Sequence, residues 1–217
     1  HVNHGLQAAA STFEAHCRGL CERANVPLTV AEVAVDTQGE GIEGAARNAR
    51  YEAFFATLPA GDTLWLAQHQ DDQAETFLLA ALRGSGVRGL AGMPYRRDAH
   101  AITLLRPWLT VGRAALEKAA QSLDLCWCED PTNRDISLDR NRLRHRVLPT
   151  LRERWPGADE ALASSAQHAS EADNLLSEYA QQELQALLTI DDQCVDNQYL
   201  NAAALSVRSR PRQRLLV

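Results

Sequence analysis

The spacing of apolar and polar residues divides the chain into an alternating part and a purely helical part. Four segments carry apolar residues at helical spacing, and these lie at residues 6–24, 42–57, 71–82 and 110–123. Three short apolar runs between them are typical of strands, and these lie at residues 27–35, 63–67 and 102–105. Strands that alternate with helices predict an α/β fold, with a parallel sheet covered by helices on both faces.

Details of these segments give further expectations. The run 63–67 should be a buried strand. Gly39 and Gly41 should end the strand at 27–35. In 71–82, Ala74, Phe77, Leu78, Ala81 and Leu82 form one apolar stripe. Gly84 and Gly86 should stop this helix, and Thr110 is a candidate N-cap for the helix after it.

The alternation ends at Pro156 and Gly157. From Leu162 to Leu187 apolar residues recur at steps of three, four or seven, which predicts one long amphipathic helix. We therefore expect two domains, residues 1–155 with the α/β fold and residues 156–217 as a smaller α-helical region. The apolar face of that second region would need a covering partner.

Composition narrows the class of protein. The 217 residues are 45% hydrophobic and 23% charged, as in a globular protein with a sizeable core. No apolar run reaches membrane-spanning length and no secretory signal is present, so we expect a soluble, cytoplasmic protein without a membrane partner. The chain starts with His1 and its only methionine is Met93, which indicates a fragment.

Charge is unevenly distributed. A net charge of −6 argues against a protein that coats nucleic acid without selectivity. Residues 134–154 nevertheless form a basic island with seven arginines. The odd number of cysteines favours free thiols, which we expect to be small buried residues; they are Cys17, Cys21, Cys126, Cys128 and Cys194.

The junction between the strand at 63–67 and the next helix carries a polar cluster that includes His69. Asp72 and Glu75 are three positions apart, so they share one face of the helix. Such a pair can hold an amine or Mg²⁺, or accept a proton from a nucleophile. Acids also favour helix starts because of the macrodipole, and the spacing alone does not separate the two interpretations.

Two further segments can carry chemistry, each with a plainer alternative. The glycine-rich run 83–93 can bring backbone N–H groups near a phosphate, although a helix stop is the commoner reason for it. Arg140 and Arg144 are one helical turn apart and can hold phosphates or a base, although for arginines alone a solvated helix face is the commoner explanation. His1 and His4 lack neighbouring acids or cysteines, and the cysteines lack CxxC spacing, so we expect no metal site built by the chain.

Together, six segments in order resemble the tRNA(Ile)-lysidine synthetases, a branch of the PP-loop ATP pyrophosphatases. They are HVNHGL at 1–6, ARNARYEAF at 46–54, AQHQDDQAET at 67–76, RGSGVRGLAGM at 83–93, RPW at 106–108, and EDPTN with RNRLR at 129–133 and 140–144. The resemblance implies a Rossmann-like PP-loop domain. It also implies ATP-dependent adenylation of the anticodon cytidine of a tRNA(Ile) with a CAU anticodon, followed by attack of the L-lysine side-chain amine.

The resemblance also implies roles for individual residues. Catalytic roles would belong to Asp72, Glu75 and Arg144. The substrates would be held by Asn133, Arg140, Asn141 and His69. Contacts with ATP, used with Mg²⁺, would come from Asn3, His4, Arg83, Gly84, Ser85 and Gly86. Family members are often homodimers.

Two segments of the family pattern are not found in this sequence. The SGGxDS pyrophosphate loop and the family's C-terminal tRNA-binding domain are not in it, so we expect this chain alone not to use ATP productively. A tRNA cytidine thiolase of the same fold is a rival, although it would need cysteine-bound iron–sulfur or a persulfide carrier. A second rival is a non-catalytic tRNA-binding module.

Overall fold

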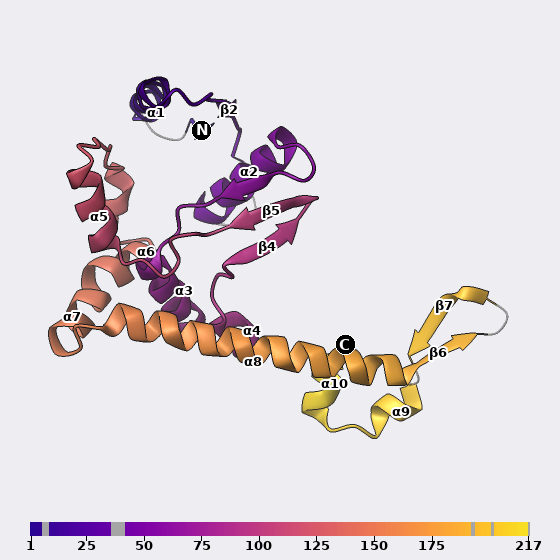
Figure 1. Ribbon diagram of the computed structural model, residues 1–217. Coiled ribbons are helices and arrows are strands. Elements are labelled where there is room, and N and C mark those ends of the chain that lie inside the picture. Colours follow the sequence, from indigo (N-terminus) through magenta and orange to yellow (C-terminus); the bar gives the residue numbers. More distant parts are fainter. Residues whose placement is uncertain (6–8, 36–41, 192–193, 201, 217) are drawn as a thin grey trace. The chain divides into compact units, whose positions relative to one another are not determined.

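A computed structural model describes residues 1–5, 9–35, 42–191, 194–200 and 202–216 (Figure 1). Leu6, Gly39 and Gly41 and the side chain of Cys194 lie outside the described part, so the expectations for them are not addressed. By its contacts the chain divides into two compact units. Unit 1 is His1–Asp72 with Tyr95–Pro156, and unit 2 is Gln73–Pro94 with Gly157–Val217.

Unit 1 contains the α/β part of the chain. Its strands are β1 (Val2–Asn3), β2 (Ala31–Glu32), β3 (Thr63–Trp65), β4 (Arg96–Ala99) and β5 (Ile102–Leu105). Its helices are α1 (Ala10–Ala24), α2 (Ile42–Thr57), α5 (Arg113–Ser122), the 3-10 turn η1 (Pro131–Arg134), α6 (Asp139–Arg142), the π-helical turn η2 (Leu143–Val147) and α7 (Leu148–Arg154). Helix α3 (Gln70–Leu82) begins in unit 1 and continues into unit 2.

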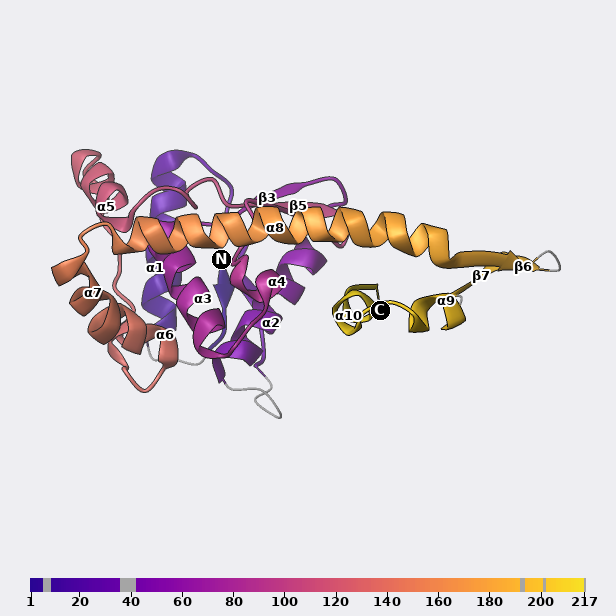
Figure 2. The same cartoon turned by 90° about the horizontal axis from the view of Figure 1, so that it is seen from below.

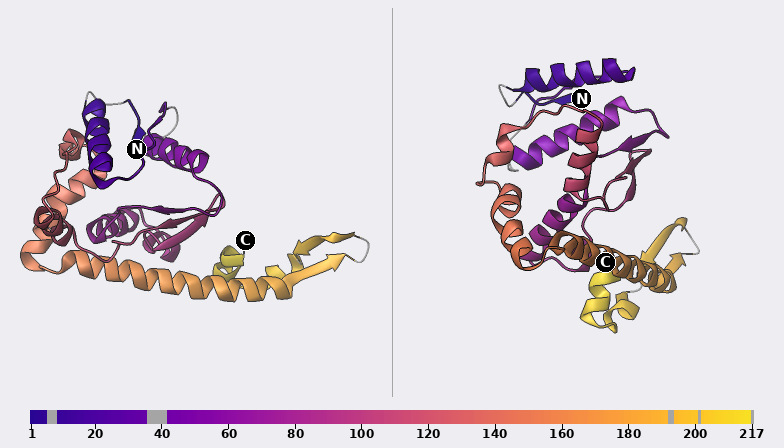
Figure 3. Two further views of the ribbon diagram at one scale, coloured as in Figure 1. Left: turned by 45° about the horizontal axis from the view of Figure 1, so that its top comes forward. Right: turned by 60° about the vertical axis from the view of Figure 1, so that its left-hand side comes forward.

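The strands of unit 1 form two small sheets. Strands β1 and β2 pair in parallel, and Figure 3 shows α1 beside the first of them. In the other sheet the order is β3-β5-β4, with β3 parallel and β4 antiparallel to β5. The α/β class is confirmed, but the expectation of a wholly parallel sheet is wrong at β4. A two-residue turn joins β4 to β5, and so short a connection permits only antiparallel pairing.

Two expectations, one about strand β3 and one about the start of helix α5, are wrong. Strand β3 is not buried, since Trp65 is 72% exposed, because β3 lies at an edge of the sheet and has only β5 beside it. Thr110 does not cap α5, which begins after Gly112 without a side-chain cap. The core of unit 1 lies instead around Leu104 and Leu148, both fully buried.

The cysteine expectation is also wrong in part. Cys126 and Cys128 are exposed, and Cys17 and Cys21 are half-buried. The first two lie in the extended segment after α5, which contributes no strand or helix, so no neighbouring element covers them.

Unit 2 consists of the rest of α3, α4 (Val87–Leu90), the long helix α8 (Ala158–Leu187), a hairpin of β6 (Leu188–Asp191) and β7 (Cys194–Leu200), α9 (Ala202–Ser206) and α10 (Arg210–Leu216). Figure 2 shows α8 running unbroken into the hairpin, so the predicted long helix is confirmed. The hairpin was not predicted. None of the described helices combines the length and apolar character that crossing a membrane requires.

Candidate functional site

The turn from β3 into α3 is built around two aspartates in the first turn of the helix. Asp72 is the third residue of α3, and its Oδ2 accepts the backbone N–H of His69, the residue just before the helix, at 3.0 Å. This contact is one half of a capping box, and it satisfies one of the N–H groups that a helix start leaves without partners. The positive end of the helix dipole favours the negative charge of both carboxylates. Capping therefore explains part of why acids stand here.

Asp72 also faces two basic side chains. Its Oδ1 lies 3.5 Å from Nη2 of Arg144, and its Oδ2 lies 3.5 Å from Nε2 of His69. The side chains of Asp72 and Arg144 are 15% and 20% exposed, so solvent screens this pair only partly. Arg144 is 72 positions away in sequence and lies in the π-helical turn η2. The structure thus brings together the acid and the arginine that the sequence analysis singled out.

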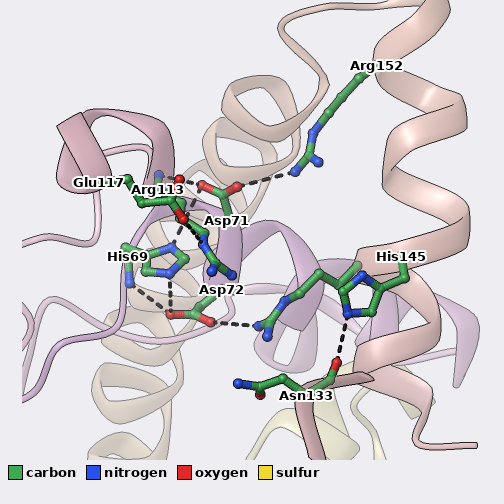
Figure 4. Close-up of polar contacts among 9 residues, drawn as sticks. His69, Asp71, Asp72, Arg113, Glu117, Asn133, His145 and Arg152 are labelled. Atoms are coloured by element: carbon green, nitrogen blue, oxygen red, sulfur yellow. Dashed lines mark hydrogen bonds and ion pairs between the residues drawn. The ribbon is translucent and has the colours of Figure 1, made fainter. Parts of the chain in front are cut away.

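Asp71 joins the same turn to two other helices (Figure 4). Its Oδ1 accepts the backbone N–H of Arg113, the first residue of α5, at 2.8 Å. Its Oδ2 lies 3.2 Å from Nη2 of Arg152 in α7, and its Oδ1 lies 3.7 Å from Nδ1 of His69. Sequence reasoning gave Asp71 and Arg152 no such role. A usable signal was present, because Arg140, Arg144 and Arg152 fall at multiples of four along one helical segment.

The segment around Arg144 is held to the preceding loop by the side chains of Asn141 and His145. The side-chain amide of Asn141 is 6% exposed and donates to the carbonyls of Thr132 and Asp135, at 2.8 and 3.0 Å. His145 Nε2 lies 2.7 Å from the carbonyl oxygen of Asn133, as Figure 4 shows. Asn141 and His145 therefore fix the path of the 130–136 loop, and His145 does so through the backbone of Asn133.

Glu75 lies one turn beyond Asp72 on α3 and is fully buried. A buried carboxyl group is costly unless it is hydrogen-bonded or paired. Arg140, in α6, is half-buried. Glu75 is therefore less accessible than Asp72 and Arg144, whereas Arg140 is in the same range as these two.

Asn3 and His4 lie where β1 ends. Asn3 Oδ1 accepts the N–H of Gly5 at 3.0 Å, and its amide donates to Glu14 in α1 at 3.3 Å. His4 Nε2 accepts from Nε of Arg50 in α2 at 3.4 Å. Burial, and then the Arg50 charge, lower the pKa of His4, so its neutral form is favoured. Its buried Nδ1 meets no hydrogen-bond partner within the described ranges, which leaves one ring nitrogen for a ligand.

The glycine-rich run begins as a helix stop. Gly84 has φ +70°, its N–H donates to Ala81, and the Ser85 N–H donates to Ala80, each at 3.0 Å. These are the two hydrogen bonds of a Schellman motif, which uses glycine because its left-handed conformation costs little there. Two backbone N–H groups of the run are therefore engaged in ending α3. Gly86 precedes α4, and Arg83 is exposed.

Metal ligands are sparse at these positions. Within the part of the chain that the structure describes, no three His, Cys, Asp or Glu side chains gather in a metal-binding group. His1 Nδ1 lies 3.6 Å from Cys17 Sγ, a contact that joins the residue before β1 to α1.

Comparisons with known proteins show the family to which the chain belongs. A family model described as a PP-loop domain matches residues 1–151. The chain is 49% identical over 215 residues to a tRNA(Ile)-lysidine synthase of Pseudomonas fluorescens (strain Pf0-1), which covers 99% of this chain and 48% of that protein. It is 50% identical over 186 residues to the tRNA(Ile)-lysidine synthase of Pseudomonas aeruginosa, covering 86% and 42%. The chain thus spans about half the length of these relatives.

A solved structure supports the fold. The U34-tRNA thiolase NcsA from Methanococcus maripaludis, determined with its [4Fe-4S] cluster, superposes with a TM-score of 0.61 at 14% identity. The match covers 78% of this chain and 61% of that one, and at this identity it speaks for the fold alone. Since the family model covers residues 1–151 of the 217, the chain belongs to the PP-loop domain family.

Proposed function

We propose that the protein of which this chain is part is a tRNA(Ile)-lysidine synthase, an ATP-dependent ligase that modifies RNA. The observation that carries the proposal is the contact of Asp72 with Arg144 where β3 leads into α3. In parallel sheets, ligands bind beyond the carboxyl ends of strands, which is where this pair lies. The relatives that share about half of the residues are lysidine synthases.

The proposed reaction has two steps. The C2 oxygen of the anticodon cytidine attacks the α-phosphate of ATP, and pyrophosphate leaves. The ε-amine of lysine then attacks C2, and AMP leaves with the oxygen. The amine is protonated at neutral pH, so it must lose a proton before it can attack.

The proposal gives these residues the following roles. Asp72, with Glu75 beside it on α3, would bind the ammonium group of lysine and receive its proton. Arg144, with Arg140, would stabilise the negative charge of the adenylated base and of the departing AMP. In the free protein Arg144 neutralises Asp72, so lysine would replace one cation with another at that carboxylate.

Further contacts would come from the surrounding loops. His69 and the loop held by Asn141, which includes Asn133, would position the cytidine and lysine. Asn3 and His4 would contact ATP, His4 through the ring nitrogen that has no partner among the described residues, and residues 83–86 would also contribute to ATP binding. The substrate tRNA(Ile) would carry a CAU anticodon. Residues 1–155 would form the nucleotide-binding domain, and residues 156–217 would help hold the tRNA.

Mg²⁺ is expected with ATP, but the aspartates of this turn do not fit an all-protein Mg²⁺ site. Asp71 and Asp72 already accept hydrogen bonds from backbone N–H groups and face arginines, whereas Mg²⁺ requires oxygen ligands in octahedral geometry. No step of the reaction is therefore assigned to Mg²⁺ bound by these two residues.

The test compares Asp72→Asn with Asp98→Asn in the complete gene product. Asp98 is an exposed carboxylate on β4 that bonds Thr103 and Arg96, so it controls for loss of one negative charge. We expect Asp72→Asn to raise the KM for lysine roughly tenfold to a hundredfold, the effect of losing a charged hydrogen bond, with unchanged ATP affinity. Lysine-dependent AMP release and an ATP titration measure the two quantities.

An unchanged lysine KM in Asp72→Asn would remove the proposed role of this residue. A complete protein that binds tRNA(Ile) but forms no lysidine with any combination of substrates would instead be a non-catalytic tRNA-binding module.

A further inference from the structure

A pocket lies in unit 1 away from the turn that carries Asp71 and Asp72, called here the aspartate turn. Its volume is about 500 Å³, and it lies between α2 and the turn that joins β4 to β5. Its lining includes Arg47, Tyr51, Glu52 and Phe55 from α2, with Arg97 and His100. His100 precedes the first residue of β5, whereas the aspartate turn follows the last residue of β3. Because β3 and β5 are parallel, the two places are at opposite ends of these strands.

Aromatic rings line this pocket. The rings of Phe55 and His100 have centroids 4.3 Å apart with an angle of 31° between their planes. The Tyr51 ring lies 6.1 Å from that of Phe55. Flat rings grouped in a pocket present π faces on which another planar ring can stack.

The backbone that carries His100 is strained. His100 has φ +50° and Ala101 has φ +63°, and together they form the two-residue turn between the paired Ala99 and Ile102. Turns with two left-handed residues favour Gly, Asn and Asp. Strained backbone that persists is often found at functional sites. Here the strain places the imidazole against Phe55, and that is the placement that builds the aromatic wall.

Cationic side chains stand beside the rings. The guanidinium carbon of Arg47 lies 5.5 Å from the centre of the Tyr51 ring. Arg97 is exposed, and its side chain forms no hydrogen bond or ion pair with the residues whose placement is described. Two guanidinium groups near aromatic rings suit a ligand with a planar ring and a phosphate. The Glu52 carboxylate can accept from an amine or a ribose hydroxyl.

We propose that this pocket binds one nucleoside monophosphate unit, with the base against Tyr51, Phe55 and His100 and the phosphate between Arg47 and Arg97. Such a unit is available in single-stranded RNA, where the bases are unstacked and open to aromatic side chains. A free mononucleotide has the same chemistry. The choice of RNA as the main source rests on the proposed function, since a tRNA-modifying protein meets RNA as its substrate.

The experiment measures binding of a fluorescein-labelled single-stranded RNA by anisotropy over a series of salt concentrations, with AMP as a competitor. Arg97→Ala should weaken binding and reduce the slope of log K against log salt by roughly 0.7, the contribution of one phosphate on a single strand. Arg96→Ala is the matched control, because this neighbour on β4 has the same charge but pairs with Asp98. It should leave the slope unchanged.

A second variant tests the ring. His100→Asn suits the left-handed backbone, so the protein should fold with an unchanged Tm, while loss of stacking should weaken RNA binding roughly tenfold. The affinity of AMP, measured by competition, is compared with that of the RNA. Similar affinities support a free nucleotide as the source, and much tighter binding of the RNA supports a single strand. Wild-type binding by both Arg97→Ala and His100→Asn would overturn the proposal, as would an equal loss in Arg96→Ala.

The outcome is separable from that of the proposed function. If the complete protein forms lysidine while the pocket variants bind RNA normally, only the pocket inference fails. If binding depends on the pocket but no lysidine forms, only the proposed function fails.

Discussion

Removing the carboxylate of Asp71 should lower the free energy of unfolding by more than the exposure of this side chain suggests. This side chain is 20% exposed, and it connects the start of α3 to the first backbone N–H of α5 and to Arg152 of α7. Asp71→Asn removes the charge but keeps an oxygen that can accept from Arg113. Asp71→Ala removes both. Comparing the two variants separates the ion pair from the hydrogen bond to the backbone.

The magnitudes follow from the exposure of each partner. Arg152 is 35% exposed, so losing that ion pair should cost about 0.2–1 kcal/mol. Losing a carboxylate at a helix start should cost about 0.3–1 kcal/mol more. Asp71→Asn should therefore lower the free energy of unfolding by roughly 0.5–2 kcal/mol. Asp71→Ala also leaves the Arg113 N–H without its charged acceptor, which adds about 1.5–3 kcal/mol.

Urea unfolding followed by circular dichroism measures these differences, with the exposed Glu22→Gln as a control for loss of one charge. A double-mutant cycle of Asp71→Asn with Arg152→Ala should give a coupling below about 1 kcal/mol. If Asp71→Ala proves no more destabilising than Asp71→Asn, the hydrogen bond to Arg113 does not hold α5, and the reasoning is refuted.

Three further changes test other parts of the structure. Gly92→Ala should cost roughly 1–3 kcal/mol in urea unfolding, since φ is +64° and the new Cβ would lie 2.7 Å from Oε1 of Gln73; a cost near zero would contradict the geometry. Asn141→Ala should cost about 1–3 kcal/mol by removing the two hydrogen bonds that this buried amide donates to the loop, and wild-type stability would show that the amide does not hold the loop. Because burial and Arg50 lower the pKa of His4, the unfolded chain binds the extra proton first, and stability should fall as pH drops below about 6.5 until the folded pKa is passed. His4→Gln should flatten that part of a pH series of unfolding curves, and an identical slope would assign the effect to other groups.

Local patterns predicted those elements whose apolar residues keep a regular period. Helix α2 spans Ile42–Thr57 as expected, and Ala45 is buried on its apolar face. The long helix α8 and strand β5 also appear where the spacing placed them. In these segments the residues that must face the core are set by the period of the element itself, so the sequence alone carries the information.

Strand β4 shows what the local pattern did not contain. Its residues Arg96–Ala99 are mostly polar and exposed, and the turn after it has His100 and Ala101 instead of the glycine or asparagine that marks a hairpin. No apolar alternation or turn signal was available, so this strand and its antiparallel direction became visible only in the folded chain.

The candidate site was predicted in part. The sequence placed Asp72 at a helix start and Arg144 in a basic segment, and only the resemblance to a known family joined them. Asp71 and Arg152 received no role, because their contact links positions 81 apart. A one-dimensional pattern records which side of each element avoids water. Which elements then meet depends on how the chain turns back on itself, and for this site the tertiary structure alone determined that.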